Sequence, residues 1–443
     1  MLTKNYQALR SAARQIGGKS TGLGVLFEPA FELPDLTGEL RCLLEVPQVS
    51  MRDLGTCHGH PVTLMDMMGN PGTRTTKSFA SFLMVGRAVE HIRRTGERIL
   101  IVTPSSANKA TALRDAVQRA IALGLVSDDE LRIAVVVPST SLSKLWRNPL
   151  LDEGGRSQKN PVVVYDGPER ASVKALTTTF AETQSETVGN RFGWRLWYTL
   201  RIENYMVADA ARALVEHEHF GVAEAGRVHV HSVSSAFGLL GHHFGHQLLV
   251  EQGAVSADPK YFLVQHLDTP DMVLHALHGE FSRGNVPAYS YDSATGLHRQ
   301  SADPHFPYAV ADLGEILDST FYTRTPVTSA EMSALIRRNG GGGIVVSLHE
   351  CLERYPSIRA RLAPVGIELP ADPRLLREWS LVMAFTGLYN AIDRGLLTAG
   401  DEIVVHGSGS YSERDYRQIE RRGVRPVTDV DGLREVIQSA LLA

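Results

Sequence analysis

The chain has 443 residues, of which 43% are hydrophobic and 21% are charged, and its formal net charge at pH 7 is -4. This length and hydrophobic content are enough for the cores of two or three domains. The small net charge and the lack of any long block of lysine and arginine argue against a nucleic-acid partner. No apolar run approaches the length of a membrane span, so we expect no membrane partner either.

The first residues and the cysteines favour a cytoplasmic protein. Residues 1–6 lead into an amphipathic segment, residues 7–16, rather than into the apolar core of a signal peptide. Cys42, Cys57 and Cys351 are too few and too scattered for a disulfide framework. We therefore expect the protein in the cytoplasm, and we assign these cysteines no chemistry.

A lysine between a turn and a helix is the first candidate functional residue along the chain. Lys77 follows the turn of residues 69–72, and the pattern predicts a helix over residues 78–94. A lysine in this setting can form a Schiff base with a carbonyl group, whereas most lysines are solvated surface charges. The segments that follow decide between these two interpretations.

A strand, a polar turn and a second helix come next. Residues 99–102 form an apolar strand, residues 103–108 a turn with hydroxyl and amide side chains, and residues 109–123 a helix. Unpaired N–H groups and the helix dipole make such a helix N-terminus a binding place for carboxylates and phosphates. The turn is therefore predicted to bind an anion.

Apolar strands continue to alternate with helices farther along the chain. The predicted strands are residues 99–103, 131–137, 161–165, 228–231, 262–265, 344–347 and 402–405. Strands that alternate with helices are typical of βα units. The sequence therefore predicts an α/β protein with a mainly parallel sheet.

Four polar segments occur in a distinctive order along this pattern. They are Asn-Pro-Gly-Thr-Arg-Thr-Thr-Lys-Ser-Phe (70–79), Ser-Ser-Ala-Asn-Lys-Ala (105–110), Ser-Val-Ser-Ser-Ala-Phe-Gly (232–238) and a closing region (378–410) that ends in Gly-Ser-Gly-Ser. They resemble the lysine motif, the carboxylate loop, the phosphate loop and the closing elements of pyridoxal-phosphate enzymes with the tryptophan synthase β-like fold (fold type II). Threonine synthase is more similar than cysteine synthase or serine dehydratase.

The resemblance implies a fold and a division into domains. The fold would have two domains, each with a mainly parallel sheet flanked by helices. Residues 1–88 and 200–443 would form the large cofactor-binding domain, and residues 89–199 would form a small mobile α/β domain.

The resemblance also implies roles for individual residues. Lys77 would form the Schiff base with pyridoxal 5'-phosphate and act as the catalytic residue. The other cofactor-binding residues would be Asn108 at the phenolic oxygen, Ser234, Ser235, Ala236, Phe237 and Gly238 at the phosphate, and Ser410 with Ser408 at the pyridine nitrogen. The substrate-binding residues would be Ser105, Ser106, Ala107, Lys109 and Arg74.

Several residues depart from the family's motifs. Ala107 and Ala110 stand where the family often has glycine, Lys109 where a small hydroxylated residue is usual, and Ala236 in place of the phosphate-loop asparagine. Lys109 and Arg74 add positive charge that suits a substrate with a phosphate or a second carboxylate, unless both side chains point into solvent. We therefore expect an unusual amino-acid substrate, in specialised metabolism.

The resemblance predicts a lyase or synthase that catalyses β- or γ-elimination or replacement. A neutral hydroxyl at Ser410 would leave the ring nitrogen of the cofactor largely unprotonated, and family members of this sort favour those reactions over transamination. Relatives are often dimers, so a homodimer is left open.

Two other functions stay open on the sequence alone. The chain could be a non-catalytic binding protein that keeps the fold, or a metal-dependent α/β enzyme that uses a cluster of histidines. That cluster comprises His229, His231, His242, His243 and His246. His242 and His246 are four residues apart on one helix face, as metal ligands often are. The spacing alone is common by chance, so we assign no metal.

Overall fold

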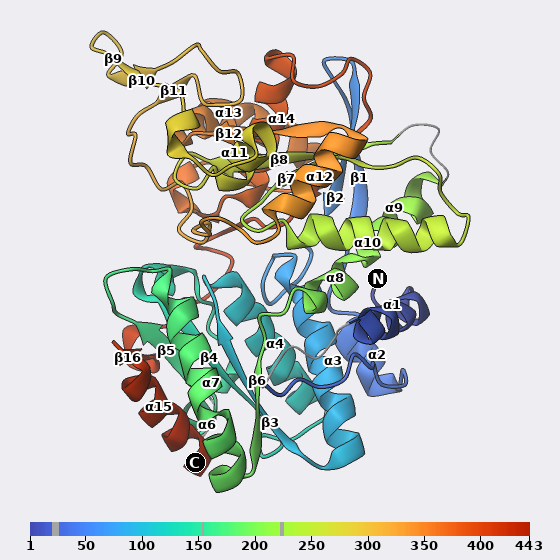
Figure 1. Cartoon of the computed structure of the whole chain (residues 1–443), viewed down its shortest axis with the longest axis vertical. Helices are drawn as coiled ribbons and strands as arrows, with labels where there is room; N and C mark the ends of the chain where they lie inside the picture. Colours follow the sequence, from blue (N-terminus) through green and yellow to red (C-terminus); the bar gives the residue numbers. More distant parts are fainter. Residues whose placement is uncertain (20–25, 153–154, 222–225) are drawn as a thin grey trace. The chain divides into compact units, whose positions relative to one another are not determined.

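The computed structural model describes residues 1–19, 26–152, 155–221 and 226–443. It shows two compact units, each with its own sheet (Figure 1). Unit 1 comprises residues 1–48, 70–211 and 416–443, and unit 2 comprises residues 49–69 and 212–415. Among the described residues, no helix is long and apolar enough to cross a membrane.

Unit 1 contains a five-stranded parallel sheet in the order β16-β5-β4-β3-β6. Its strands are β3 (Arg98–Pro104), β4 (Leu131–Pro138), β5 (Val162–Tyr165), β6 (Trp194–Tyr198) and β16 (Arg425–Val427). Its helices are α1 (Tyr6–Lys19), α2 (Gly38–Leu44), α3 (Lys77–Thr95), α4 (Asn108–Ala122), α5 (Pro149–Asp152), α6 (Arg156–Lys159), α7 (Ser172–Phe192), α8 (Glu203–Asp209) and α15 (Val430–Leu442), with short 3-10 turns at Ser139–Lys144 and Arg421–Gly423.

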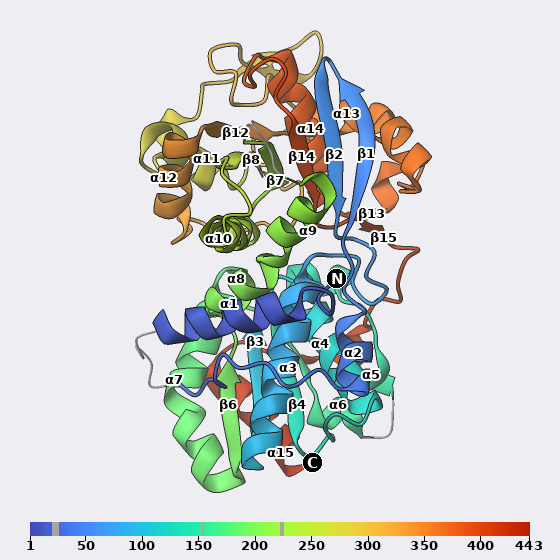
Figure 2. The ribbon, with the colours of Figure 1, turned by 90° about the vertical axis from the view of Figure 1, so that its right-hand side faces the viewer.

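Helices cover both faces of the sheet of unit 1. α7 and α15 pack on one face and α3 and α4 on the other (Figures 1 and 2). The central strands β3 and β4 are nearly continuous runs of buried aliphatic residues. Such runs are expected for parallel strands that are buried on both faces.

The boundaries of unit 1 differ from those of the predicted small domain. Residues 1–48, 70–88, 200–211 and 416–443, which were predicted to belong to the large domain, lie in unit 1 together with residues 89–199. The C-terminal segment is there because β16 pairs in parallel with β5 and α15 packs on α7. No local sequence pattern predicts that the C-terminal segment joins the sheet of unit 1.

Unit 2 contains a six-stranded sheet in the order β1-β2-β14-β7-β8-β12. Its main strands are β1 (Ser50–Cys57), β2 (His60–Asp66), β7 (Val228–Ser232), β8 (Lys260–His266), β12 (Gly341–Val346) and β14 (Ile403–Gly407). Its helices are α9 (Ala211–Phe220, beginning at the last residue of unit 1), α10 (Phe237–Glu251), α11 (Asp271–His278), α12 (Ser329–Asn339), α13 (Leu348–Leu362) and α14 (Ser380–Asp393). Smaller elements are β9 (Ser290–Asp292), β10 (Leu297–Arg299), β11 (Ala309–Val310), β13 (Leu376–Glu378), β15 (Tyr411–Ser412) and 3-10 turns at Arg283–Asn285, Ala363–Val365 and Pro373–Leu375.

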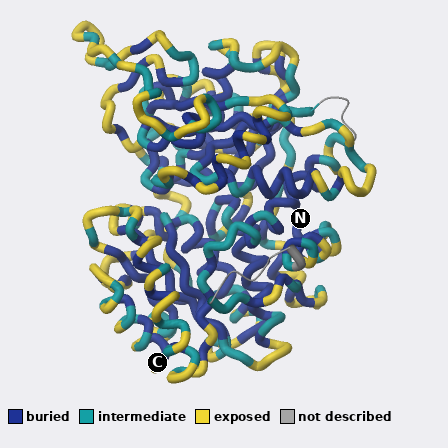
Figure 3. The backbone as a smooth tube through the Cα atoms, in the orientation of Figure 1, coloured by how far each residue is buried: buried dark blue, intermediate teal, exposed yellow. Residues whose placement is uncertain are grey.

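The two faces of the sheet in unit 2 differ in chemistry. The β1–β2 hairpin is antiparallel and the other strand pairs of this sheet are parallel. One face packs apolar residues such as Val230 and Val405 against α13 and α14. Because side chains alternate along a strand, His229 and His406 lie on the opposite face, where α10 contacts them. In both units the central strands are buried, and exposed residues gather on the edge strands, in the loops and on outer helix faces (Figure 3).

Candidate functional site

Lys77 is the first residue of α3, at the end of a tightly bonded loop. The buried side chain of Asn70 accepts a hydrogen bond from the Gln48 N–H at 2.8 Å and donates to the Thr75 carbonyl at 3.3 Å. Ser78 Oγ donates to the same carbonyl at 3.0 Å. These contacts fix the loop, while Lys77 itself is only partly buried.

The loop before Lys77 also touches α4. A Cβ atom on Gly72 would lie 2.4 Å from Cγ of Asp115, so only glycine fits at this position. Burial raises the pKa of Asp115, and Arg119 opposes that rise with a hydrogen bond of 3.0 Å. The lysine loop is therefore held against the helix that follows the predicted carboxylate loop.

The carboxylate loop is closed by the hydroxyl of Ser105. Its Oγ accepts hydrogen bonds from the N–H groups of Ala107 at 3.1 Å and Ala110 at 2.9 Å. Ala107 has φ 137° and ψ -58°, a conformation that normally requires glycine. The chain thus keeps the backbone of a glycine loop with an alanine in it, at a cost of about 1 to 3 kcal/mol. Asn108 begins α4 and is partly exposed.

Lys109 points inward. Its side chain is buried, its Nζ donates to the Thr199 carbonyl at 2.6 Å, and it lies 5.7 Å from the ring centroid of Tyr205. Burial lowers the pKa of Lys109 well below its usual value, and the nearby charge of Lys77 lowers it further. Binding of a substrate anion by Lys109 stays a prediction. Arg74 is partly exposed and has φ 48°.

In unit 2, the predicted phosphate loop joins β7 to α10. Ala236, with φ 51°, is the residue before α10, whose first N–H groups have no partner within the helix. Ser234 Oγ donates to Thr323 Oγ1 at 3.0 Å, and Ser235 Oγ does so at 3.4 Å. Thr323 lies in an irregular segment without a motif, so sequence patterns gave no signal for it.

A buried arginine lies against the same loop and was also missed. A Cβ atom on Gly238 would be 2.3 Å from Nη2 of Arg212, so this glycine makes room for the guanidinium. Arg212 is 2% exposed and comes from the start of α9, 26 residues before Gly238. No local pattern connects the two positions.

Ser408 and Ser410 follow β14 in unit 2, and both are buried. The carbonyl of Gly409, between them, accepts a hydrogen bond from the N–H of Leu381 in α14 at 3.1 Å. Glu378, a fully buried carboxylate, is opposite Tyr411 in the β13–β15 pair. Of the predicted residues, unit 1 thus holds Arg74, Lys77 and 105–109, and unit 2 holds 234–238, Ser408 and Ser410.

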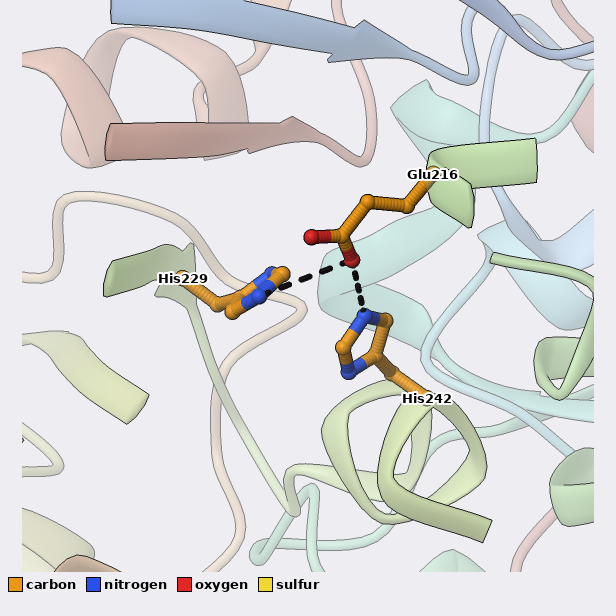
Figure 4. A group of neighbouring side chains, drawn as sticks. All are labelled: Glu216, His229 and His242. Atoms are coloured by element: carbon orange, nitrogen blue, oxygen red, sulfur yellow. Dashed lines mark hydrogen bonds and ion pairs between the residues drawn. The ribbon is translucent and has the colours of Figure 1, made fainter. Parts of the chain in front are cut away.

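Two histidines of the cluster, His229 and His242, meet the buried carboxylate of Glu216 in unit 2 (Figure 4). Glu216 of α9 accepts a hydrogen bond on Oε2 from His242 Nε2 at 2.7 Å, and His229 Nε2 lies 3.6 Å from the same oxygen. Two histidines and a glutamate can ligate zinc. On the other side, His229 Nδ1 is 3.0 Å from His406 Nε2, and His406 Nδ1 is 3.0 Å from Nη1 of Arg212.

The direction of these hydrogen bonds follows from Arg212. A guanidinium can only donate, so His406 accepts on Nδ1 and carries its proton on Nε2. His406 then donates to Nδ1 of His229, whose own proton is on Nε2 and faces Glu216. A metal ion would need the lone pair of that same nitrogen. The bond directions therefore favour a relay that runs from Arg212 through His406 and His229 toward Glu216 over a metal centre. The last step of this relay, 3.6 Å, is an electrostatic contact that is too long for a hydrogen bond.

The histidines of this relay are neutral. Burial lowers the pKa of His229 to about 3, and it also lowers the pKa values of His242 and His406 well below the usual value. For His406 the charge of Arg212 acts in the same direction. The relay thus connects a guanidinium to a carboxylate through two neutral rings.

Residues 1–441 match DUF6002, described as a family of unknown function. The chain belongs to this family. Comparison with curated proteins gives no match.

Solved structures show the fold. The chain is similar to PLP-bound threonine synthase from Brucella melitensis (TM-score 0.57, 10% identity, covering 98% of this chain and 89% of that one). It is also similar to holo diaminopropionate ammonia lyase from Escherichia coli (TM-score 0.50, 13% identity, covering 98% and 93%). The chain therefore has the tryptophan synthase β-like fold of fold type II pyridoxal-phosphate enzymes, which confirms the predicted fold class and the resemblance at the level of fold.

Strained backbone gathers in the loops described above. Five non-glycine residues of the described chain have positive φ, and one of them, His58, lies in the turn between β1 and β2 instead. Arg74, Ala107 and Ala236 lie in the lysine, carboxylate and phosphate loops, and Thr325 lies two residues beyond Thr323. Such strain persists only where the surrounding structure enforces it, and it clusters at binding sites. Taken unit by unit, the start of α4 and Lys77 at the start of α3 in unit 1, and the start of α10 in unit 2, are each chemically suited to one part of pyridoxal phosphate.

Proposed function

We propose that the protein is a pyridoxal-phosphate-dependent lyase or synthase that catalyses β- or γ-elimination or replacement on an amino-acid substrate. The observation that best supports this function is the strained backbone at Arg74, Ala107 and Ala236. These residues lie in the three loops that the resemblance marks, and Ala107 keeps the backbone conformation of the glycine that the family often has there. A cytoplasmic location, specialised metabolism and a homodimer belong to the same proposal.

Each loop would have a distinct task toward the cofactor. Lys77 would attach it covalently and then exchange a proton with Cα of the substrate. The N–H groups at the start of α10, with Ser234 and Ser235, would hold its phosphate. Asn108 would meet its phenolic oxygen and Ser410, with Ser408, its pyridine nitrogen. When bound, pyridoxal phosphate supplies the electron sink that stabilises the charge left at Cα.

The substrate carboxylate would bind at the start of α4. Ser105 Oγ already accepts two N–H groups, so its own proton is free to be donated to an anion. Ser106 adds a further hydroxyl donor, and the helix dipole at the start of α4 adds positive potential. Fixing the carboxylate orients the Cα–H bond toward the base, which is the main contribution that positioning makes to such a reaction. Arg74 would provide charge for a second anionic group.

The reaction class rests on Ser410. A hydroxyl partner is neutral, so it leaves the pyridine nitrogen largely unprotonated, and this favours elimination and replacement over transamination. Replacing Ser410 with aspartate is expected to shift the products toward transamination. Release of the keto acid and formation of the aminated cofactor would be measured by chromatography.

The proposal is tested by titrating the purified protein with pyridoxal phosphate and recording its visible absorbance. We expect a band of lysine-bound cofactor that is lost in Lys77→Ala and kept in Lys174→Ala, which removes an exposed lysine of α7 in the same unit. Amino acids that shift the band are candidate substrates. A bound cofactor that no amino acid perturbs would instead favour the non-catalytic binding protein, and the absence of any band would reject the proposal.

A further inference from the structure

Arg212 occupies an unusual position for a buried cation. Its guanidinium fills the space where Gly238 would carry a side chain, in the first turn of α10. The helix dipole at that turn favours an anion. A fixed positive charge beneath it adds to the same electrostatic potential, and buried charges act with little screening.

The relay of histidines holds this guanidinium in place. Nη1 of Arg212 donates to His406, which donates to His229, whose Nε2–H faces Glu216. His406 and His229 are fully buried. Glu216 is anchored in turn by His242 at 2.7 Å and Arg227 at 3.3 Å. One side of the guanidinium is thereby fixed by the core of unit 2, while Nη2 is its atom nearest to Gly238.

We propose that Arg212 is a phosphate-binding residue of the loop formed by residues 234–238, and that His406 is its positioning residue. The ligand chemistry is a phosphate group, either that of the cofactor or free inorganic phosphate. For the cofactor, the inference rests on the proposed function. For inorganic phosphate it is independent of it.

The test compares ligands that differ only in the phosphate. Affinities for pyridoxal phosphate and for pyridoxal, which lacks the phosphate, are measured by absorbance for the wild-type protein and for Arg212→Met. We expect Arg212→Met to weaken the binding of pyridoxal phosphate about 10- to 100-fold, which is the effect of losing one hydrogen bond to a charged group. The affinity for pyridoxal should not change. If Arg212 has only a structural role, the substitution should weaken the binding of both ligands equally, and that result would overturn the inference.

Further variants guard against a folding defect. Gly238→Ala leaves Arg212 in the chain but displaces its guanidinium, so it should show the same selective loss. Arg394→Met removes an arginine of unit 2 whose side chain is 6% exposed and binds Glu350, and it should leave the preference for the phosphate unchanged. His406→Leu should lose part of the preference, whereas His406→Gln, which can still accept from Arg212 and donate to His229, should retain it.

Binding of inorganic phosphate, followed by calorimetry, separates this inference from the proposed function. If the wild-type protein binds phosphate in an Arg212-dependent way but not pyridoxal phosphate, the proposed function fails and the anion site stands. If pyridoxal phosphate binds equally well to wild type and Arg212→Met, the inference fails and the function stands. Binding of neither ligand would overturn both.

Discussion

Lys109 and Arg114 of unit 1 are held in a different way from Arg212 of unit 2, although unit 1 also buries Arg87 beside the carboxylate of Glu28. In unit 1, Lys109 and Arg114 donate to the backbone carbonyls of Thr199 and Asn160. In unit 2, Arg212 is linked through two histidines to the carboxylate of Glu216. A carbonyl carries only a partial charge, so burial lowers the pKa of Lys109 strongly and that of Arg114 to about 9.

The difference matches the chemistry that we propose for each unit. In unit 1, the amine of Lys109 has a depressed pKa and is close enough to repel the charge of Lys77. Such repulsion suits a unit in which Lys77 would act as a nucleophile. A guanidinium anchored to a carboxylate belongs to a unit that needs a permanent positive charge next to a phosphate. Three variants or conditions test this contrast.

Removal of the carboxylate of Glu216 should have the largest effect on the free energy of unfolding. Glu216→Ala leaves His242 and Arg227 without their shared acceptor, and breaking a buried ion pair costs about 3 to 5 kcal/mol. Denaturant unfolding should show this loss. Glu218→Ala, at an exposed position of the same helix, should change stability by less than about 0.5 kcal/mol. An equally small effect at Glu216 would mean that the relay contributes nothing to the stability of unit 2.

Acid should destabilise unit 2 before unit 1. The pKa of His229 is about 3 in the folded chain, below its ordinary value, so the unfolded chain binds more protons at intermediate pH. The contribution of His229 to the free energy of unfolding is therefore fully present above about pH 6.5, and it is lost as the pH falls from there toward 3. His242 and His406 shift in the same direction, and each group contributes up to about 1.4 kcal/mol per pH unit.

The tryptophans allow this loss to be assigned to a unit. Trp379 lies in unit 2, and Trp146, Trp194 and Trp197 lie in unit 1. Unfolding at pH 7, 6 and 5 would be followed by fluorescence in a variant that keeps Trp379 alone and in one that lacks only Trp379. Acid sensitivity that is equal in the two variants would contradict the contrast between the units.

Relief of strain in unit 1 should have the smallest effect. Ala107→Gly removes the cost of a positive φ but adds flexibility to the unfolded chain, so we expect a net gain of about 1 kcal/mol. Ala110→Gly, three residues later inside α4, should instead lose about 1 kcal/mol. Both values are read from chemical denaturation. Destabilisation by both substitutions would show that the backbone at Ala107 is not strained.

The sequence predicts what depends on local pattern. Alternating aliphatic runs and helices identify the parallel α/β class, and the turn before residue 78 predicts the start of α3 to within a residue. The polar loops at 105–108 and 234–236 were expected where strands end and helices begin, and α4 and α10 do begin there.

What the sequence misses depends on pairing between distant segments. The register of β14 beside β7 brings His406 next to His229, and these residues are 177 positions apart. Arg212 and Thr323 reach the loop at 234–238 from segments without a motif. The histidine spacing suggested His242 and His246 as a pair, whereas the structure joins His242 to Glu216, which no helical or strand period connects to it.

The most direct test of the account is to locate the attached cofactor. The protein is incubated with pyridoxal phosphate, the link is made permanent with borohydride, and the modified peptide is identified by mass spectrometry. We expect a single pyridoxyl group on Lys77, absent from Lys77→Ala and unchanged in Lys174→Ala. Label spread over surface lysines, with none on the peptide that contains Lys77, would contradict the proposed role of this lysine.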